Sequence, residues 1–282
     1  MADIALNIKK QSFLHTYRKD NWWVEPLTVL SVFGGFIVYA TWAAFQGTNY
    51  WYSAGVVEGF GGYLSPFYSP LVYIKEGVQG GAPMAHALLG SWPSWWPAFL
   101  PASPAFFILA FPGLFRFTCY YYRGAYYKAF AGTPPACVVG SVPQKRFRGE
   151  TFLLVFQNLH RYALYIAILF IPILYFDAVQ GFFRGGEFGI GVGSIILLIN
   201  PTLLACYTFG CHSFRHLVGG RKDCFSCAGT GVLRYGTYQK VSWLNKHHKL
   251  FAWLSLFGVA LTDVYVRLVA NGTITDLSTW GN

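Results

Sequence analysis

Hydrophobic residues are arranged along the chain in five long apolar runs separated by polar segments. The runs cover residues 26–46, 104–122, 151–176, 188–211 and 241–270. A helix that crosses the hydrocarbon core of a bilayer needs about 20 such residues. The first and fourth runs carry no charge, but the second contains Arg116, the third His160 and Arg161, and the fifth Asp263 and Arg267. The pattern predicts an all-α integral membrane protein with five transmembrane helices.

Composition excludes the other broad classes. Charged residues make up 11% of the chain and hydrophobic residues 54%, whereas soluble domains carry roughly 25% charged residues. A soluble globular enzyme could not cover its surface with so few charges. Intrinsic disorder is excluded by the aromatic content of 20%, because disordered chains are poor in aromatic residues.

The distribution of Lys and Arg predicts the orientation in the membrane. The first 25 residues hold four cations, residues 123–150 hold five and residues 213–249 hold seven, while each alternate segment holds one. Cytoplasmic loops carry the excess of Lys and Arg, so the N-terminus is expected in the cytoplasm and the C-terminus outside. The net charge of +10 therefore indicates topology and not a nucleic-acid partner.

The predicted spans divide the chain into five parts. They are a cytoplasmic segment 1–25, a first span 26–46, an outer loop 47–103 rich in Trp, Gly and Pro, a four-helix redox bundle 104–270 and an outer tail 271–282. The outer loop has two interpretations. It is either an interfacial loop whose Trp residues form a belt, or a re-entrant lid over a hydrophobic ligand.

Cysteine and histidine residues gather at the cytoplasmic ends of the last four predicted spans. Five of the seven His residues lie in this band. The members of the band are Cys119, His160, Cys211, His212, His216, His247 and His248. Polar groups inside a membrane are costly and usually functional, so the band predicts a buried metal or heme centre.

Several centres are compatible with these residues. Two Cys and two His suit a Rieske-type [2Fe–2S] cluster, whereas heme b needs one or two axial His. Zinc also accepts two Cys and two His but has no redox chemistry. The structural alternative is that the Cys residues are small buried hydrophobes and the His residues cap helix ends. A transporter would need repeated halves or broken helices, neither of which is evident, and a plain anchor without a redox role remains open.

Four stretches of the sequence resemble the membrane anchor of actinobacterial, mycobacterial-type succinate dehydrogenases. They are RFTCYYYRGAYY at 116–127, QNLHRY at 157–162, CHSFRHLVGG at 211–220 and LTDVYVRL at 261–268. The resemblance extends over roughly residues 105–270.

This resemblance implies a function in respiratory complex II. The chain would be a multi-pass subunit of the bacterial plasma membrane, without a succinate-oxidising site of its own. It would bind a flavoprotein subunit and an iron–sulfur subunit at the cytoplasmic face, contact lipids, and pass electrons to a quinone, with menaquinone the expected type. A Rieske-type cluster would replace heme, with ligands from Cys119, Cys211, His160 and one of His216 or His248. The alternative is a heme b-ligating cytochrome subunit of another quinone-linked dehydrogenase or fumarate reductase.

A quinone site is expected beyond the centre, toward the outer leaflet. Asp263 and Arg267 lie there one helical turn apart, and Asp177 lies at the outer end of the third run. Quinone reduction takes up protons, and a nearby carboxylate can relay them. The alternative, equally supported by the sequence, is that Asp263 and Arg267 form a structural ion pair.

Overall fold

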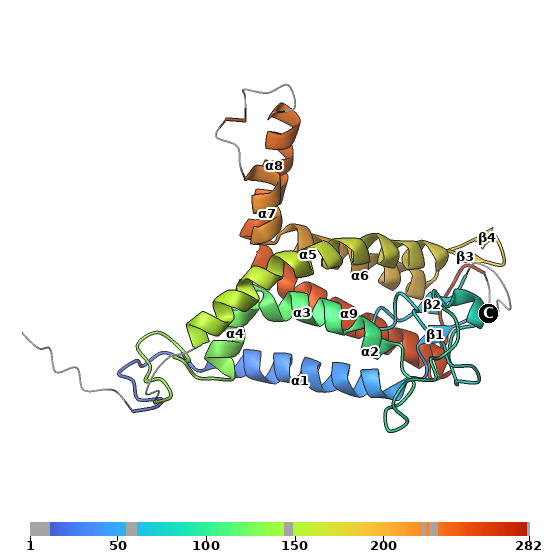
Figure 1. The fold of residues 1–282 in the computed structure, drawn as a ribbon, viewed down its shortest axis with the longest axis horizontal. Helices are drawn as coiled ribbons and strands as arrows, with labels where there is room; N and C mark the ends of the chain where they lie inside the picture. The colour runs from blue at the N-terminus through green and yellow to red at the C-terminus, as the bar shows by residue number, and fades with distance from the viewer. Residues whose placement is uncertain (1–11, 55–60, 144–148, 221–223, 226–230, 281–282) are drawn as a thin grey trace, which may run out of the picture. The chain divides into compact units, whose positions relative to one another are not determined.

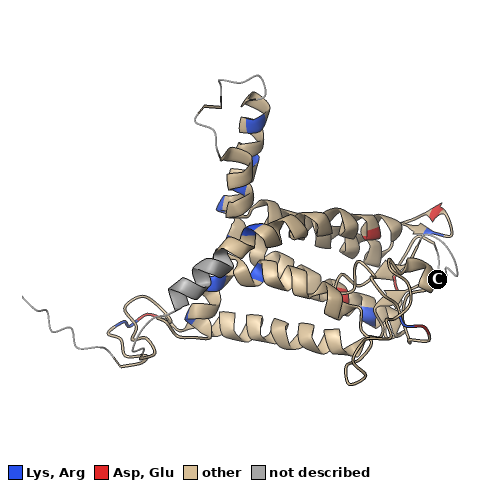
Figure 2. Ribbon diagram, viewed as in Figure 1, with Lys and Arg blue, Asp and Glu red and all other residues tan. Residues whose placement is uncertain are grey.

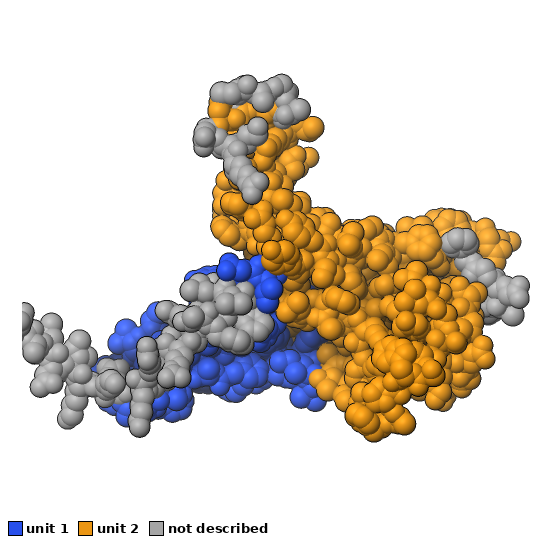
Figure 3. Space-filling view, viewed as in Figure 1, with its two compact units in different colours: residues 1–38, 116–159 blue, residues 39–115, 160–282 orange. Residues whose placement is uncertain are grey.

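The computed structural model of the chain describes residues 12–54, 61–143, 149–220, 224–225 and 231–280, with residues 149–157 described by their backbone alone. The chain divides into two compact units, one of residues 1–38 and 116–159 and the other of residues 39–115 and 160–282 (Figure 3). We call them unit 1 and unit 2 and describe each by itself. Some of the basic residues counted above lie outside the described residues, namely Lys9, Lys10, Lys145, Arg146, Arg148, Arg221 and Lys222.

Four helices are long and apolar enough to cross a membrane. They are α1 (Val24–Gln46), α5 (Gly149–Gln180, with its apolar stretch at Asn158–Gln180), α6 (Val192–Phe209) and α9 (His248–Ala270) (Figure 1). These helices correspond to the first, third, fourth and fifth apolar runs. The structure thus confirms a mostly helical protein with several candidate spans.

The second apolar run does not form one long helix. It forms α2 (Ala105–Ile108) and α3 (Ala110–Thr118), and α4 (Tyr120–Ala129) follows after a break. The break lies at Cys119, whose φ of −65° and ψ of 130° are extended. The apolar helical stretch Ala105–Thr118 is therefore shorter than the four candidate spans, and the predicted count of five stays a prediction.

In unit 1, the first half of α1 packs against α4 and the loop after it. The ring of Phe33 lies 5.4 Å from the ring of Tyr122 and 6.0 Å from the ring of Phe130. Gly34 faces the same Phe130 ring, which a Cβ would meet at 3.9 Å. That distance is ordinary van der Waals contact, so an alanine would fit at this position as well.

Unit 2 carries two further helices, which form an arm between the C-terminal end of α6 and the N-terminal end of α9. Helices α7 (His212–Gly219) and α8 (Gly231–Lys246) pack on each other and run across the direction of α6 and α9 (Figure 1). Lys and Arg side chains of unit 2 gather on this arm, whereas α6 carries no charge (Figure 2). The fifth apolar run was predicted to begin at Val241, but this residue lies in α8, and α9 begins only at His248.

Short strands add to the expected all-α fold. Strands β1 (Trp51–Tyr52) and β2 (Tyr63–Leu64) pair antiparallel, as do β3 (Phe183–Arg184) and β4 (Glu187–Phe188), and a single 3₁₀ turn η1 spans Met84–His86. Gly185 and Gly186 join β3 to β4 with φ angles of 59° and 90°, which favour glycine in a two-residue hairpin loop. The fourth predicted span, which is α6, therefore begins at Val192 and not at the predicted Phe188.

The outer loop is a folded cap on unit 2. We call residues 47–54 and 61–103 the outer cap. Its side chains Tyr50, Tyr63, Phe67 and Tyr68 are buried, and Tyr63 packs into a core with Ala178, Leu197 and Val266 from the helices α5, α6 and α9. Trp95 is 66% exposed but Trp51 is buried, so a Trp belt describes only part of this segment.

Candidate functional site

A buried histidine and a buried cysteine touch each other in unit 2. Nε2 of His160 on α5 lies 2.9 Å from Sγ of Cys211, which directly precedes α7. Their exposed fractions are 7% and 2%. The two residues are 51 positions apart in sequence, and both are among the predicted metal ligands. Imidazole and thiol are donors that soft transition metals accept, so this contact is the centre of the candidate site.

Aromatic rings extend the site from His160 to His248. The ring of Phe115 stacks on His160 at 4.8 Å and 6°, and it also meets Tyr207 edge-on at 5.4 Å. The ring of Tyr207 in turn stacks on His248 at 4.9 Å and 20°. Phe115 and Tyr207 are 3% and 1% exposed. Two stacked rings, those of Phe115 and Tyr207, therefore connect His160 to His248, and both rings are buried.

A break between α6 and α7 aims Cys211 into the site. Gly210 ends α6, and Cys211 is extended, with φ −64° and ψ 141°, before α7 begins. A Cβ on Gly210 would lie 2.7 Å from the carbonyl oxygen of Cys206 and 3.0 Å from that of Leu244. The Nδ2 group of Asn245 donates a hydrogen bond to the Gly210 carbonyl at 2.8 Å. Close approach of the chain from α8 thus requires glycine at this break.

Cys119 occupies a matching position in unit 1. It is buried, extended, and immediately precedes α4. Nearby, Arg116 donates a hydrogen bond to the hydroxyl of Tyr122 at 2.6 Å and stacks over its ring. Both predicted cysteine ligands therefore lie at a helix N-terminus, whose partial positive charge favours anionic ligands such as thiolates. Because Cys119 belongs to unit 1 and the other predicted ligands to unit 2, we describe its surroundings separately.

The alternative ligand His216 is placed differently. It lies on α7 and is exposed, whereas His160 is buried and His248 is half-buried. Among the described residues, no group of three or more His, Cys, Asp or Glu side chains is arranged as a metal site. The structure brings together His160 and Cys211, places His248 behind Tyr207, and leaves His216 at the surface.

The predicted pair Asp263 and Arg267 is an ion pair inside a saturated network. Nε of Arg267 lies 2.7 Å from Oδ2 of Asp263, and Asp263 is fully buried. The carboxylate also accepts hydrogen bonds from the hydroxyls of Tyr39 and Ser65. The guanidinium donates to the carbonyl oxygens of Thr48 and Ala43 and to the Tyr68 hydroxyl, at 3.0 Å, 3.3 Å and 3.1 Å respectively. These contacts join α1, α9 and the outer cap.

The predicted Asp177 lines a cavity of about 510 Å³ at the outer end of α5. Its carboxylate accepts a hydrogen bond from the Ser69 hydroxyl. His86 lines the same cavity, and burial lowers the pKa of its imidazole, which favours the neutral ring. The remaining walls are mostly apolar and aromatic, including Trp51 and Phe176. The cavity is therefore mostly apolar, with the polar side chains of His86, Asp177 and Gln180 at its wall.

A second buried carboxylate was missed in the sequence. Asp276, in the predicted outer tail, is 2% exposed. Its carboxylate accepts hydrogen bonds from the hydroxyls of Tyr63 at 2.7 Å and Tyr265 at 2.6 Å. It also accepts hydrogen bonds from the Arg184 guanidinium at 2.7 Å and the Gly193 backbone N–H at 2.9 Å. Arg184 also stacks on Trp280, 4.3 Å from its ring. A lone Asp near the end of a chain carries no signal that could have identified it.

Other residues of the candidate site were also missed. Phe115 and Tyr207 lie in uniform apolar runs, where a stacking ring has no distinctive sequence pattern. The break at Cys211 was detectable in part, because the preceding Gly210 is a helix-ending residue. A straight helix would have aimed Cys211 and His212 in different directions, and the break removes that objection to Cys211 as a ligand.

Fold and site define a helical membrane protein of several spans with a buried His–Cys contact near one end of its helices. Residues 24–272 match the family described as actinobacterial succinate dehydrogenase subunit SdhC. Among solved structures, the chain is similar to a chain of the Mycobacterium smegmatis Sdh1 complex in the apo form, with 40% identity, a TM-score of 0.80 and 96% of each chain covered. A search of curated proteins gives no match. The chain belongs to the actinobacterial SdhC family, and is thus a multi-pass membrane subunit of a succinate dehydrogenase complex.

Proposed function

We propose that this subunit carries electrons from an iron–sulfur subunit, through a metal centre near the cytoplasmic ends of its helices, to a quinone near the outer leaflet. Cys119, His160, Cys211 and His248 would hold the centre. The observation that carries the proposal is the buried contact between the His160 imidazole and the Cys211 thiol. A buried polar pair of this kind inside a membrane helix bundle is costly, and soft ligands of two types favour a redox metal.

The donor set fits a Rieske-type cluster by chemistry. Such a cluster takes two Cys on one iron and two His on the other, and the candidates supply two of each. His248 is preferred to His216 because it is half-buried and stacked on Tyr207, whereas His216 is exposed. The thiol within 2.9 Å of the His160 nitrogen favours a mixed donor set over heme b, whose axial histidine nitrogen would face a porphyrin iron.

A bound [2Fe–2S] cluster would supply one-electron transfer. The residues of the chain would hold the cluster and exclude water from it. Phe115 covers one face of His160, and Tyr207 covers one face of His248. The arm of α7 and α8, with the loop that joins α4 to α5, would contact the iron–sulfur subunit. Basic side chains on these segments would be complementary to an acidic or neutral patch on that partner. A flavoprotein subunit would carry out succinate oxidation itself.

The Asp177 cavity is the best-supported acceptor site. It is mostly apolar, about 510 Å³ in volume, and has a carboxylate and an imidazole at its wall. A neutral His86 can hydrogen-bond a quinone oxygen, and Asp177 can pass a proton to the reduced ring. Asp263 and Arg267 are better explained as the structural pair that the sequence left open, because their hydrogen bonds are taken up by neighbouring residues. On this proposal the subunit crosses the membrane five times, with its N-terminus in the cytoplasm.

The metal centre is tested by changing the histidines one at a time in the purified complex. His160→Ala and His248→Ala should each remove a Rieske-type electron paramagnetic resonance signal and abolish quinone reduction. Succinate oxidation with a soluble dye should persist, because that chemistry lies in another subunit. His216→Ala is the matched control and should keep the signal. Retention of the signal in His160→Ala would show that His160 is not a ligand.

An optical spectrum separates the two kinds of centre. Reduced heme b gives a sharp α band, whereas a Rieske cluster gives broad, weak absorption. A sharp reduced band in the wild-type complex, lost in His160→Ala, would favour the cytochrome alternative. Loss of iron and acid-labile sulfide in equal amounts from His160→Ala, relative to the wild-type complex, would support the cluster, because the clusters of the iron–sulfur subunit contribute equally to both samples.

The acceptor site has its own test. Asp177→Asn should slow quinone reduction while leaving the metal centre and dye-linked oxidation intact. Ser69→Ala, which removes only the hydrogen bond to this carboxylate, should have a smaller effect. Normal quinone turnover in Asp177→Asn would move the acceptor site away from this cavity.

A further inference from the structure

Arg116 is a buried cation near the end of α3 in unit 1. It is the first Asp, Glu, Lys or Arg after Glu76, and its exposed fraction is only 8%. Arginine stays protonated in proteins, and a charge inside a membrane is costly and usually functional. A guanidinium that extends to the lipid headgroups keeps its charged end in water, whereas Arg116 is buried. Its burial therefore indicates a role inside the protein.

The contacts of Arg116 connect the two helices that meet at Cys119. The carbonyl oxygen of Arg116 accepts a hydrogen bond from the Cys119 backbone N–H at 3.1 Å. Its guanidinium donates to the Tyr122 hydroxyl at 2.6 Å and lies 5.5 Å from the centre of the Tyr122 ring. Tyr122 is fully buried and packs on Phe33 of α1. Arg116 and Tyr122 therefore bridge the break between α3 and α4, with Cys119 between them in sequence.

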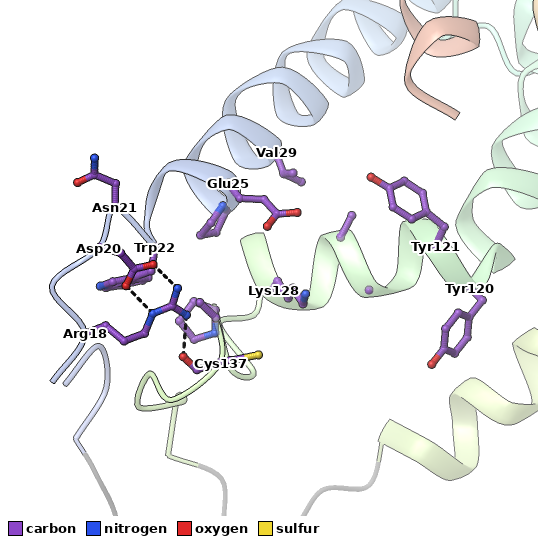
Figure 4. Close-up of a pocket in the computed structure, with 15 residues that line it drawn as sticks. Arg18, Asp20, Asn21, Trp22, Glu25, Val29, Tyr120, Tyr121, Lys128 and Cys137 are labelled. Carbon is purple, nitrogen blue, oxygen red and sulfur yellow. Dashed lines mark hydrogen bonds and ion pairs between the residues drawn. The ribbon is translucent and has the colours of Figure 1, made fainter. Parts of the chain in front are cut away.

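The bridge lies away from the open side of α4. A cavity of about 530 Å³ follows that open side, where Tyr120, Tyr121 and Lys128 of α4 line it (Figure 4). Arg116 and Tyr122 are not among the described residues that line this cavity. The charge of Arg116 is thus held away from solvent, and a buried charge is screened much less than an exposed one.

We propose that Arg116 is a positioning residue for the metal centre and raises its reduction potential. The inference rests on the proposed function, in which Cys119 is a ligand of that centre. When the centre accepts one electron from the iron–sulfur subunit, it becomes more negative by one charge, and it loses that charge when it passes the electron on. A buried cation near the cysteine ligand stabilises the reduced form, because opposite charges attract more strongly at a low dielectric constant. Tyr122 orients the guanidinium, and its neutral hydroxyl does so without cancelling the positive charge.

The test is a redox titration of the whole purified complex, in which electron paramagnetic resonance detects the reduced centre. Arg116→Gln should lower the ratio of reduced to oxidised centre at a fixed potential about tenfold, which is about 59 mV for a one-electron couple. A unit charge about 12 Å away produces that factor at an effective dielectric constant of about 20. Arg116→Lys keeps the charge and should shift the midpoint potential much less. A residue with only a structural role would give equal shifts in the two variants.

Two controls separate the buried charge from other features of the break. Arg123→Gln removes a cation that is also close to Cys119 in sequence but is half-buried and stacks on two tyrosine rings. Solvent screens this charge, so the midpoint potential should move little. Tyr126→Phe removes an uncharged bridge across the same break, because the Tyr126 hydroxyl donates to the Phe117 carbonyl at 3.2 Å. This variant should keep the wild-type potential.

The outcomes distinguish this inference from the proposed function. An unchanged midpoint potential in Arg116→Gln, or equal shifts in Arg116→Gln and Arg116→Lys, would overturn the inference and leave the metal centre in place. A wild-type complex without a Rieske-type signal, or a normal signal in Cys119→Ala, would refute the proposed centre or its ligand, and the inference with it. If Arg116→Gln does not assemble, Tyr122→Phe decides, because it keeps the ring but releases the guanidinium. It should lower the midpoint potential and broaden the signal, and a wild-type potential and line shape would overturn the inference.

Discussion

Removing one member of the Asp263–Arg267 pair should destabilise the subunit far more than an ordinary surface change. Asp263 is fully buried and Arg267 is 7% exposed, so Arg267→Met leaves a carboxylate in the interior without its cation. Losing one partner of a buried pair costs about 3–5 kcal/mol. Asp263→Asn keeps the shape and the hydrogen bond from Ser65 but leaves the buried Arg267 guanidinium without its carboxylate, so its cost should fall in the same range of about 3–5 kcal/mol.

The double variant separates the pair energy from the cost of each change. Asp263→Asn with Arg267→Met leaves neither charge, so its loss of stability should be smaller than the sum of the two single losses by about 1–3 kcal/mol. The assay is thermal unfolding of the purified complex, in which Arg267→Met should lower the midpoint on the order of 10 °C. Lys75→Met, a change of an exposed cation in the outer cap, is the control and should alter stability by less than about 0.5 kcal/mol.

Activity measurements decide between the structural and the proton-relay interpretations. If the pair is structural, its loss should reduce the amount of assembled complex in the membrane. Quinone reduction and succinate oxidation with a soluble dye, both measured on membranes, should then fall together. A fully assembled Asp263→Asn complex with a normal melting point and slow quinone reduction would refute this reasoning. The acceptor site would then include Asp263.

Three further predictions follow from the backbone break, the topology and the outer tail. Gly210→Ala should weaken the metal centre and lower the melting point, because its Cβ would lie 2.7 Å from a carbonyl oxygen. Gly236→Ala is the control and should change neither, because its Cβ would lie in open space. Equal effects of the two substitutions would contradict the argument that Gly210 permits close approach. Cys137 is exposed in a predicted cytoplasmic loop, so an impermeant maleimide should label it in inverted vesicles, and labelling in intact cells would reverse the orientation. Asp276→Asn should lower unfolding stability by about 2 kcal/mol, since it removes the ion pair with Arg184; an unchanged melting point would show that the tail is not held by charge.

The positions of the long helices could be predicted from the sequence because membrane spans are encoded locally. A continuous apolar run of sufficient length determines a helix wherever it lies, as in α1 and α6. Predictions were less accurate at the helix ends. The breaks at Cys119 and His247 replace long expected helices with shorter ones, and neither residue is a Pro or a Gly. A residue-type signal for a helix end is therefore missing at both positions.

The candidate site was predicted in part for a similar reason. Cys and His are rare enough in apolar runs that His160 and Cys211 were conspicuous, and the structure places them in contact. The sequence could not show whether His216 or His248 is buried. The turn between α6 and α7, and that between α8 and α9, change which side chains face the interior. The partners of Asp263 are separated from it by about 200 positions, 224 for Tyr39 and 198 for Ser65, and no local pattern connects residues so far apart.

These long separations have a consequence for biogenesis. The outer cap is synthesised early, but its ionic partners Asp263, Arg267 and Asp276 lie within the last 20 residues of the 282-residue chain. At about 5–20 residues per second, the ribosome needs on the order of 10–40 s to make the residues between Ser65 and Asp263. On the proposed topology, the cap must therefore wait on the outer side of the membrane, without its partners, until the final helix leaves the insertion machinery. A chain that stalls before that helix would expose unfinished cap segments to quality-control proteases outside the membrane.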